Sequence, residues 1–427
     1  MSGSIEVRID YLTRVEGEGT LYLKLSDGNV ERVEVGISEP TRFFEALLRG
    51  RKYYEAPDIT SRICGICPLA YVMSACRAME KLLGIRVPDE VRLLRKIAYL
   101  GEWISSHALH VTLLHAPDFL GFNSAFDMME KYSHIVKAGL RVKWWGDKVI
   151  EVIGGRAIHP ISFRVGGFYR IIKKEKLEKL LSNLEAIKKD AKLLLEWVLK
   201  LPIPGFKRDL EFISLRNGKE YPILEGRVVS NKGLDIDESE FERYIQVEQT
   251  PYSNSLRYRV KGRGSYIVGP IARFNNNYDL LKDEVKDIIE SHGMGRRLIN
   301  SFQSIVARAA EVYHAVLEIV SLIHEYSEPR QPYVEGELRE GEASAITEAP
   351  RGMLYHRYRI NADGTISDAN IIPPTSQNLA AIEDDLKVIG AELSKLSFEE
   401  AKRGAEQIIR NYDPCISCSV HAIKIVK

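Results

Sequence analysis

The chain carries two Cys-x-x-Cys pairs, one near each end, and no other feature constrains its fold as strongly. Cys64 and Cys67 form the first pair, Cys415 and Cys418 form the second, and only Cys76 lies outside them. The inner cysteines of the two pairs are 348 positions apart. Four thiolates can bind zinc, an iron–sulfur cluster or a nickel-containing centre, because sulfur is a ligand for soft metals. The pattern therefore predicts a fold that brings both ends of the chain to one shared metal site.

Other interpretations of the cysteines stay open at this point. A zinc ribbon places its pairs about 15–20 residues apart, so a local zinc module is disfavoured, although a structural four-thiolate zinc protein is not. A dithiol redox site would explain the first pair, because residues 64–67 run into a helix-like segment, but it would leave the second pair unused. Cys76 falls on the apolar side of that helix and is interpreted as a core residue.

The composition excludes several classes of function. Sixty basic and 59 acidic residues give a net charge of +1, which offers no electrostatic basis for binding nucleic acid or an anionic membrane. Residues 1–8 contain no apolar signal-peptide segment, and no uncharged apolar run of about 18 residues occurs. Cysteines in metal-type spacing suit a reducing compartment. We therefore expect a cytoplasmic protein without a membrane span.

Hydrophobic periodicity predicts a helix-dominated chain. Alternating residues over 4–37, with a turn at 26–29, predict a β-hairpin, and a second hairpin is predicted around a turn at 363–364. Helical spacing predicts helices over 70–83, 90–115, 175–200, 296–326 and 378–411. No linker divides the chain, so we expect one domain over 1–427, mainly α with some β (α+β), with long helices at the centre and hairpins near both ends.

Five motifs resemble those of nickel–iron hydrogenase large subunits. The cysteine pairs lie in residues 62–67 (RICGIC) and 413–421 (DPCISCSVH), and the other three motifs are at residues 13–17 (TRVEG), at 43–51 and at 348–352 (EAPRG). They follow the family's order and span nearly the whole chain. The resemblance implies that family's fold and a catalytic subunit for the reversible heterolytic cleavage of hydrogen.

The resemblance also implies metal ligands. Cys64 and Cys415 would be terminal ligands of nickel, and Cys67 and Cys418 would bridge nickel to an iron that carries carbon monoxide and cyanide. Soft thiolates suit both metals. Glu45 and His421 would bind a magnesium ion, because a hard cation prefers carboxylate oxygen, although a solvated helix face would explain Glu45 equally well.

The catalytic roles that the resemblance implies belong to residues around the cysteines. Glu16 would pass protons to and from the nickel thiolates, where a strand carboxylate otherwise faces solvent. Arg351 would hold its guanidinium over the open nickel position, and Asp413 would orient it by a charge-assisted hydrogen bond. Pro350 and Thr375 would lie beside the cofactor, with the Thr375 hydroxyl donating to an iron-bound cyanide. Each role has an alternative. Arg351 would otherwise form a packing salt bridge, residues 374–375 a plain turn, and Asp413 a turn before Pro414.

One position departs from the family. Ser106 stands where many members have an aspartate above the metal site, so that residue's role does not carry over. His107 and His110, which follow, share a helix face and could bind a metal, but such histidines are more often hydrogen-bonded core residues.

The chain needs partners if this interpretation is right. It has no third cysteine motif and no Rossmann or Walker loop, so an iron–sulfur small subunit and further flavin- and nicotinamide-binding subunits would carry electrons to NAD(P). The terminal motif and residues 106–110 most resemble the NAD(P)-linked sulfhydrogenase type, while deazaflavin-linked and ferredoxin- or heterodisulfide-linked types are alternatives. A metal-free structural relative, as in respiratory quinone reductases, would lack the cysteines.

The last six residues also carry a prediction. Family members are made with an extension that a dedicated protease removes once nickel-insertion proteins have loaded the site. Residues 422–427 would be that extension, and cleavage would follow His421.

Overall fold

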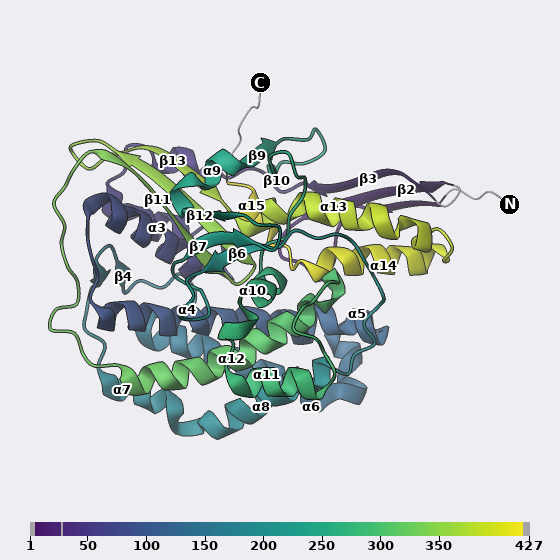
Figure 1. The fold of residues 1–427 in the computed structure, drawn as a ribbon, viewed down its shortest axis with the longest axis horizontal. Helices are drawn as coiled ribbons and strands as arrows, with labels where there is room; N and C mark the ends of the chain where they lie inside the picture. The colour runs from purple at the N-terminus through teal and green to yellow at the C-terminus, as the bar shows by residue number, and fades with distance from the viewer. Residues whose placement is uncertain (1–4, 27–28, 422–427) are drawn as a thin grey trace.

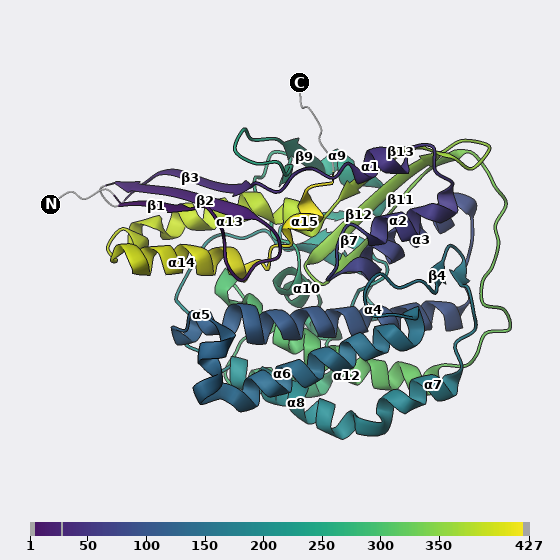
Figure 2. The same cartoon turned by 180° about the vertical axis from the view of Figure 1, so that it is seen from behind.

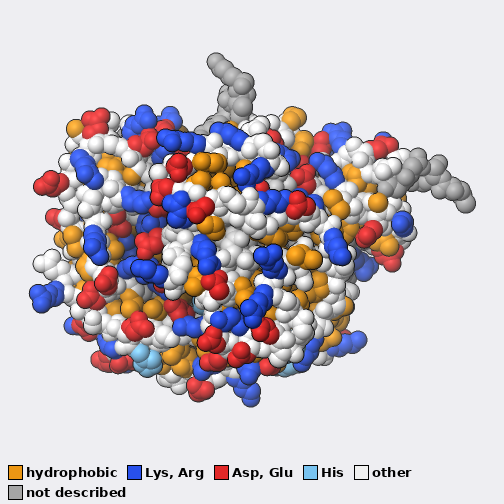
Figure 3. Space-filling view, viewed as in Figure 1, with side chains coloured by type: hydrophobic (Ala, Val, Ile, Leu, Met, Phe, Trp, Pro, Cys, Tyr) orange, Lys and Arg blue, Asp and Glu red, His pale blue; other side chains and the backbone are white. Residues whose placement is uncertain are grey.

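The computed structural model describes residues 5–26 and 29–421 of the chain. Its helices and strands lie in two layers (Figure 1): long helices form one, and small sheets with further helices form the other. The fold class predicted from the sequence is confirmed, because the described part is helix-rich with small antiparallel sheets. None of the described helices is both long enough and apolar enough to cross a bilayer. Acidic and basic side chains are mixed over the face in Figure 3, as the near-zero net charge suggests.

The helical layer is built around two long helices that pack closely. Helix α6 begins after Ser124, whose hydroxyl accepts from the Asp127 N–H at 3.3 Å. A Cβ at Gly146 would lie 2.6 Å from the Gly101 carbonyl oxygen of α4, so only glycine permits this crossing. The helices of this layer are α4 (Asp89–Leu109), α5 (Ala116–Leu120), α6 (Ala125–Gly154), α7 (Lys174–Glu178), α8 (Leu184–Val198), α11 (Asp283–Ser291) and α12 (Ser304–Glu325).

The sheets of the second layer are all antiparallel and small. At the N-terminal end, β1 (Ile5–Ile9), β2 (Gly19–Ser26) and β3 (Asn29–Ile37) form a meander. A second meander joins β11 (Gly341–Ala349), β12 (Gly352–Ile360) and β13 (Ile366–Ile372). The remaining strands are β4 (Phe163–Arg164), β5 (Gly167–Phe168), β6 (Ile213–Arg216), β7 (Arg227–Ser230), β8 (Asp235–Ile236), β9 (Ile245–Glu248) and β10 (Arg257–Val260).

The helices of the second layer connect the two ends of the chain. Helix α3 packs on β11 and β12, α13 packs on β3, and α14 contacts β1; Figure 2 shows α13 and α14 beside the N-terminal sheet. The first and last segments therefore lie together. The helices are α1 (Phe44–Leu48), α2 (Ala56–Ser61), α3 (Pro68–Leu83), α9 (Phe241–Tyr244), α10 (Pro270–Asn277), α13 (Pro374–Leu393), α14 (Phe398–Asn411) and α15 (Ile416–Ser419).

Several predicted boundaries are wrong in detail. The helix predicted over 90–115 is α4 followed by a π-helical turn at His110–His115, and the helix predicted over 175–200 is α7, a 3-10 turn and α8. The helix predicted from residue 296 begins at Ser304. Both predicted hairpins are present, each extended by a third strand. Periodicity identifies a buried face but not the point where the helical winding changes.

Candidate metal centre

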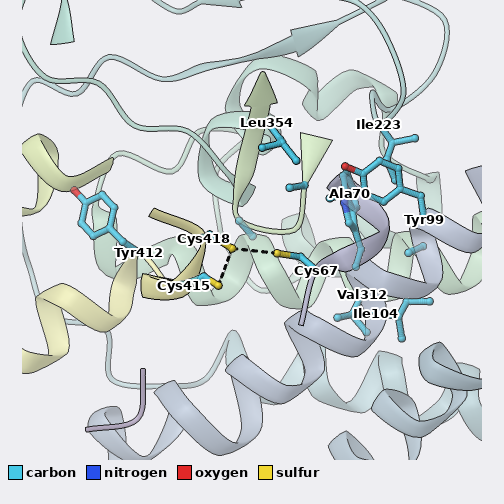
Figure 4. Packing of buried hydrophobic residues seen from close by; sticks show 14 of the residues in the cluster. Cys67, Ala70, Tyr99, Ile104, Ile223, Val312, Leu354, Tyr412, Cys415 and Cys418 are labelled. Atoms are coloured by element: carbon cyan, nitrogen blue, oxygen red, sulfur yellow. Dashed lines mark hydrogen bonds between the residues drawn. The ribbon is translucent and has the colours of Figure 1, made fainter. Parts of the chain in front are cut away.

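The structure brings the four paired cysteines together. Their sulfur atoms all lie within 4.8 Å of one another, and they are the only group of potential ligands of this size among the described residues. The Sγ atoms of Cys64 and Cys415 are 3.4 Å apart, those of Cys67 and Cys418 3.6 Å, and those of Cys415 and Cys418 2.9 Å. Figure 4 shows Cys67, Cys415 and Cys418 pointing toward one another. All four side chains are buried, as a soft-metal site requires.

Local backbone geometry aims the first pair. The N–H groups of Ile66 and Cys67 point at Cys64 Sγ from 3.2 and 3.3 Å, so the loop folds back on that sulfur. Cys67 is the N-cap of α3, and Pro68 occupies the first helical position. The positive end of the helix dipole favours a thiolate there.

The four thiols do not behave as equal acids. Hydrogen bonds from Cys415, Cys418 and Cys67 outweigh burial and hold the pKa of Cys64 well below its usual value. Burial raises the pKa of Cys415 well above the usual value. Burial thus works against four thiolates side by side, and a bound cation would stabilise them by replacing the thiol protons. This buried set of four sulfurs fits a thiolate-bound nickel–iron centre.

Glu16 lies directly against the second pair. The Ile416 N–H donates to the Glu16 carbonyl at 2.9 Å, in a parallel bridge that ties the first motif to the last. Glu16 Oε2 accepts from Cys415 Sγ at 3.1 Å and from the Ser417 N–H at 3.0 Å. The carboxylate is thus in place to exchange a proton with Cys415.

Arg351 sits at the tip of the hairpin between β11 and β12. Pro350 and Arg351 form the two-residue turn, because Ala349 pairs with Gly352. The Arg351 Nε donates to the Asp413 carbonyl at 2.8 Å, and the Arg351 Nη2 donates to Asp413 Oδ1 at 3.2 Å. Burial disfavours the charge, but Asp413 and the cysteine thiolates raise the pKa of Arg351 well above its usual value.

The remaining predicted site residues surround the terminal motif. Thr375 Oγ1 accepts from the Cys415 N–H at 3.0 Å, which leaves the hydroxyl proton to donate elsewhere. Glu45 Oε1 accepts from the Ile371 N–H at 2.7 Å and lies 3.9 Å from His421 Nδ1. Residues 422–427 and the cleavage predicted there lie outside the described residues.

The two histidines after Ser106 are engaged with protein groups. His107 Nε2 lies 2.9 Å from Glu311 Oε2, and burial lowers the pKa of His107 to about 4. His110 Nε2 lies 2.9 Å from the Arg410 carbonyl oxygen. Ser106 is buried, and its hydroxyl has no hydrogen-bond partner in the described part of the chain. The core interpretation of the histidines therefore fits the structure, as it does for buried Cys76.

Arg273 is a buried residue of this region that the sequence does not reveal. Its guanidinium donates to Glu311 from Nε and Nη2 at 2.7 and 2.6 Å, and to Glu348 from Nη1 at 2.9 Å. The same group donates to the carbonyl oxygens of Ala349 and Pro350 at 2.8 and 2.9 Å. It therefore holds the hairpin tip that carries Arg351. Nothing in the sequence around Arg273 marks it.

The sequence also does not reveal three polar residues around the terminal motif: Ser417, Glu39 and Arg42. The Ser417 hydroxyl donates to Glu16 and lies 3.2 Å from Glu39 Oε1. Glu16 and Glu39 are both half-buried, and this hydroxyl links their two carboxylates. Arg42 donates to the carbonyls of Ile63 and Ser417 and so joins the two cysteine loops. Only the position of Ser417 inside the terminal motif could have signalled it.

Comparisons with known proteins agree with this geometry. The family model for nickel-dependent hydrogenase matches residues 42–144 and 234–421. Sulfhydrogenase 1 subunit alpha of Pyrococcus furiosus is 32% identical over 99% of both chains, and sulfhydrogenase 2 subunit alpha of the same organism is 33% identical over 98% of this chain and 100% of its own. The solved structure of an NAD+-reducing [NiFe]-hydrogenase in the H2-reduced state superposes with a TM-score of 0.89 at 27% identity, covering 97% of this chain and 99% of that one.

Proposed function

Because the chain belongs to the nickel-dependent hydrogenase family, we propose that its four paired cysteines hold a nickel–iron centre. The chain is the catalytic large subunit of a nickel–iron hydrogenase, an oxidoreductase that acts on hydrogen. One observation carries the proposal for the site: four buried sulfur atoms lie within 4.8 Å of one another. We further propose that residues 1–427 form a single domain, which is supported by the larger of two buried hydrophobic clusters, because its members come from both layers.

Each cysteine has a proposed place in the centre. Cys64 and Cys415 would bind nickel terminally, and Cys67 and Cys418 would bridge nickel to an iron that carries carbon monoxide and cyanide. When bound, this centre supplies the cleavage of hydrogen into protons and electrons. Thr375 would donate its hydroxyl proton to an iron-bound cyanide, and Pro350 would pack beside these ligands. The free hydroxyl proton of Thr375 next to Cys415 supports its part.

Glu16 is the proposed proton acceptor. Its Oε2 is 3.1 Å from Cys415 Sγ, within the reach that general acid–base catalysis needs. From Glu16 the proton can pass to the Ser417 hydroxyl and on to the half-buried Glu39. A carboxylate–hydroxyl–carboxylate series can move a proton without moving the backbone.

Arg351 is the proposed electrostatic partner of the site. Two hydrogen bonds that its guanidinium donates to Asp413 fix the group, and its Nη1 has no hydrogen-bond partner among the residues described. An always-charged donor whose Nη1 keeps both N–H groups free can polarise a small molecule bound at the metals. Asp413 therefore acts by positioning Arg351.

Glu45 and His421 are the proposed magnesium ligands. A carboxylate and an imidazole nitrogen lie 3.9 Å apart there, at the point where the chain leaves α15. Magnesium would keep several of its waters at such a site. Elemental analysis of a Glu45→Gln variant should show magnesium lost relative to nickel, whereas Glu55→Gln, on the 3-10 turn at Tyr53–Glu55, should retain it.

The electrons need a path to a partner protein. The first cysteine loop reaches the surface, because Arg62 and Gly65 are exposed while Cys64 and Cys67 are buried. We propose that an iron–sulfur small subunit covers this loop and passes electrons to flavin- and nicotinamide-binding subunits that reduce NAD(P). The NAD+-reducing [NiFe]-hydrogenase named above supports that acceptor. Transfer to a deazaflavin, or to ferredoxin or heterodisulfide, is the alternative.

Two further parts of the proposal concern the cellular compartment and the maturation of the protein. All five cysteines are free, which supports a reducing cytoplasm because thiolate sites require reduced sulfur. Nickel-insertion proteins would load the site before a protease cleaves after His421. Mass spectrometry of nickel-loaded, active protein should therefore find a chain that ends at His421; an intact tail would contradict this step.

Infrared spectroscopy with metal analysis tests the proposed centre. The complex would be purified anaerobically from its host, and bands from metal-bound carbon monoxide and cyanide, with one nickel and one iron per chain, are expected. Zinc without those bands, in a chain that ends at His421, would contradict the proposal. Reduction of NAD(P) by hydrogen with the same sample would then separate the proposed acceptor from a deazaflavin or ferredoxin.

A further inference from the structure

Cys67 occupies the N-cap position of α3 but does not cap that helix. The first turn of a helix leaves N–H groups without a partner, and the side chain of the N-cap residue ordinarily accepts one of them. Helix α6 follows this rule, because Ser124 accepts from the Asp127 N–H at 3.3 Å. The Cys67 side chain makes no such bond, and its sulfur lies 3.6 Å from that of Cys418 instead (Figure 4). The N–H groups that open α3 therefore need an acceptor from another part of the chain.

Glu102 of the neighbouring helix α4 is that acceptor. Its Oε2 accepts from the Leu69 N–H at 2.7 Å, and its Oε1 accepts from the Ala70 N–H at 3.0 Å. The Glu102 side chain is fully buried, and within the described residues its two oxygens bond only these backbone N–H groups. The residue before it, Gly101, lies where α4 crosses α6. Glu102 therefore stands on a helix that is itself fixed, and both of its oxygens serve the start of α3.

The second cysteine motif is built in the same way. Cys415 is the N-cap residue of α15, and its side chain makes no capping bond either. The Ser417 N–H in the first turn of α15 donates to Glu16 Oε2 at 3.0 Å. In both motifs a glutamate from a distant segment accepts the N–H groups that open the helix, so the cysteine sulfur is free to face the other sulfurs. Glu16 also bonds a sulfur, whereas Glu102 acts on the backbone alone.

We propose that Glu102 is a positioning residue of the metal centre, which caps α3 in place of Cys67 and thereby fixes the direction of the Cys67 sulfur. The inference rests on the proposed function, because the position of that sulfur affects the reaction only when it binds a metal. Two successive N–H groups are held, so the first turn cannot shift without losing a buried hydrogen bond. Only Pro68 separates Cys67 from Leu69, and its ring fixes φ at about −65°, so the constraint reaches the cysteine.

The substitution Glu102→Gln keeps the size of the side chain but replaces one acceptor oxygen with an NH₂ group, so one N–H group of α3 loses its acceptor. The matched control is Glu383→Gln, because Glu383 is also buried and accepts from a backbone N–H, that of Val35 on β3, at 2.9 Å. Both variants would be prepared anaerobically as the intact complex. Glu102→Asp, which keeps both oxygens on a shorter side chain, takes the place of Glu102→Gln if that variant does not assemble. Hydrogen exchange of peptides that contain Leu69 and Ala70, nickel content and infrared spectra would be measured on the same samples.

In the Glu102 variant the amide that loses its acceptor should exchange about 5–30-fold faster. The nickel content should fall or the bands of the diatomic ligands should shift, while Glu383→Gln keeps the nickel content and bands of the unchanged enzyme. Unchanged exchange at the start of α3 overturns the inference. Faster exchange with unaltered nickel and bands, or an equal change of the centre in Glu383→Gln, also overturns it, because the cap would then serve the helix alone. Absence of diatomic bands from the unchanged enzyme would instead contradict the proposed function, while the exchange rates would still report the cap, so the two failures are distinguishable.

Discussion

The substitution Arg273→Lys tests whether the buried ion network behind the hairpin tip serves the metal site. Arg273 keeps all of its N–H donors occupied, because it makes five hydrogen bonds to Glu311, Glu348, Ala349 and Pro350. Lysine preserves the charge but has only three donors on one nitrogen. At least two of the five bonds must therefore be lost, in a place without solvent, since all of these groups are buried.

Both the stability and the rate should fall. Each buried acceptor left without a donor costs about 1–3 kcal/mol, so two of them lower the free energy of unfolding by about 2–6 kcal/mol. The carbonyls of Ala349 and Pro350 precede Arg351, and their release lets the guanidinium move. A displacement of about 1 Å at a reacting centre lowers a rate by about 10²-fold.

The assay is hydrogen-dependent dye reduction per bound nickel, with thermal unfolding of the same samples. Arg77→Lys is the matched control, because Arg77 pairs with Glu238 and donates to the Ile346 carbonyl of β11 at 2.8 Å, away from the turn. We expect both variants to unfold at lower temperature and only Arg273→Lys to lose rate. If Arg273→Lys is destabilised yet keeps its full rate per nickel, the network does not hold Arg351 and the reasoning is wrong.

Three further substitutions test other parts of the site. Cys418→Ser should abolish nickel binding, whereas Cys76→Ser, in the core away from the four sulfurs, should retain it. The nickel content of each purified variant is measured. Nickel bound to the Cys418→Ser variant would contradict the proposed set of ligands. Glu16→Gln should lower the hydrogen oxidation rate by about 10²–10⁴-fold with nickel unchanged, whereas exposed Glu18→Gln should not; an equal loss in both would remove the case for a specific proton acceptor. Burial raises the pKa of Glu348 from 4.5 to about 7, so the folded state holds a proton that the unfolded chain has released. The contribution of Glu348 to the free energy of unfolding therefore falls by about 3 kcal/mol as the pH rises from about 4.5 to 7. The urea midpoint should therefore decrease from pH 5 to pH 8, and the decrease should be smaller in Glu348→Gln than in the unchanged protein. An equal decrease in the two proteins would refute this.

The parts of the site that the sequence predicts are those with local chemical signatures. The spacing within each cysteine pair is such a signature, since two thiolates three residues apart can converge on one metal without help from the rest of the fold. The pairing of Arg351 with Asp413 has no local sequence signature, because 62 positions separate the two residues. Only the family resemblance predicts that they lie together. The structure supplies the physical link: a hairpin turn on one side and, on the other, Asp413 with φ 51°, a left-handed conformation that aspartate tolerates better than most residues.

Charged residues in buried helices are where the sequence misleads most. Arg308 and Glu311 lie on α12, a helix buried on nearly every side, although charges in a helical pattern ordinarily indicate a solvated face. Burial is tolerated because opposite charges gather there: Arg273 and Arg351 meet Glu311, Glu348 and Asp413. Burial lowers the pKa of Arg308 to about 10 even with Asp413 nearby, since Arg351 opposes its charge. None of these side chains can change charge without affecting the others, so the residues behind the metal site and Arg351 itself form one electrostatic unit.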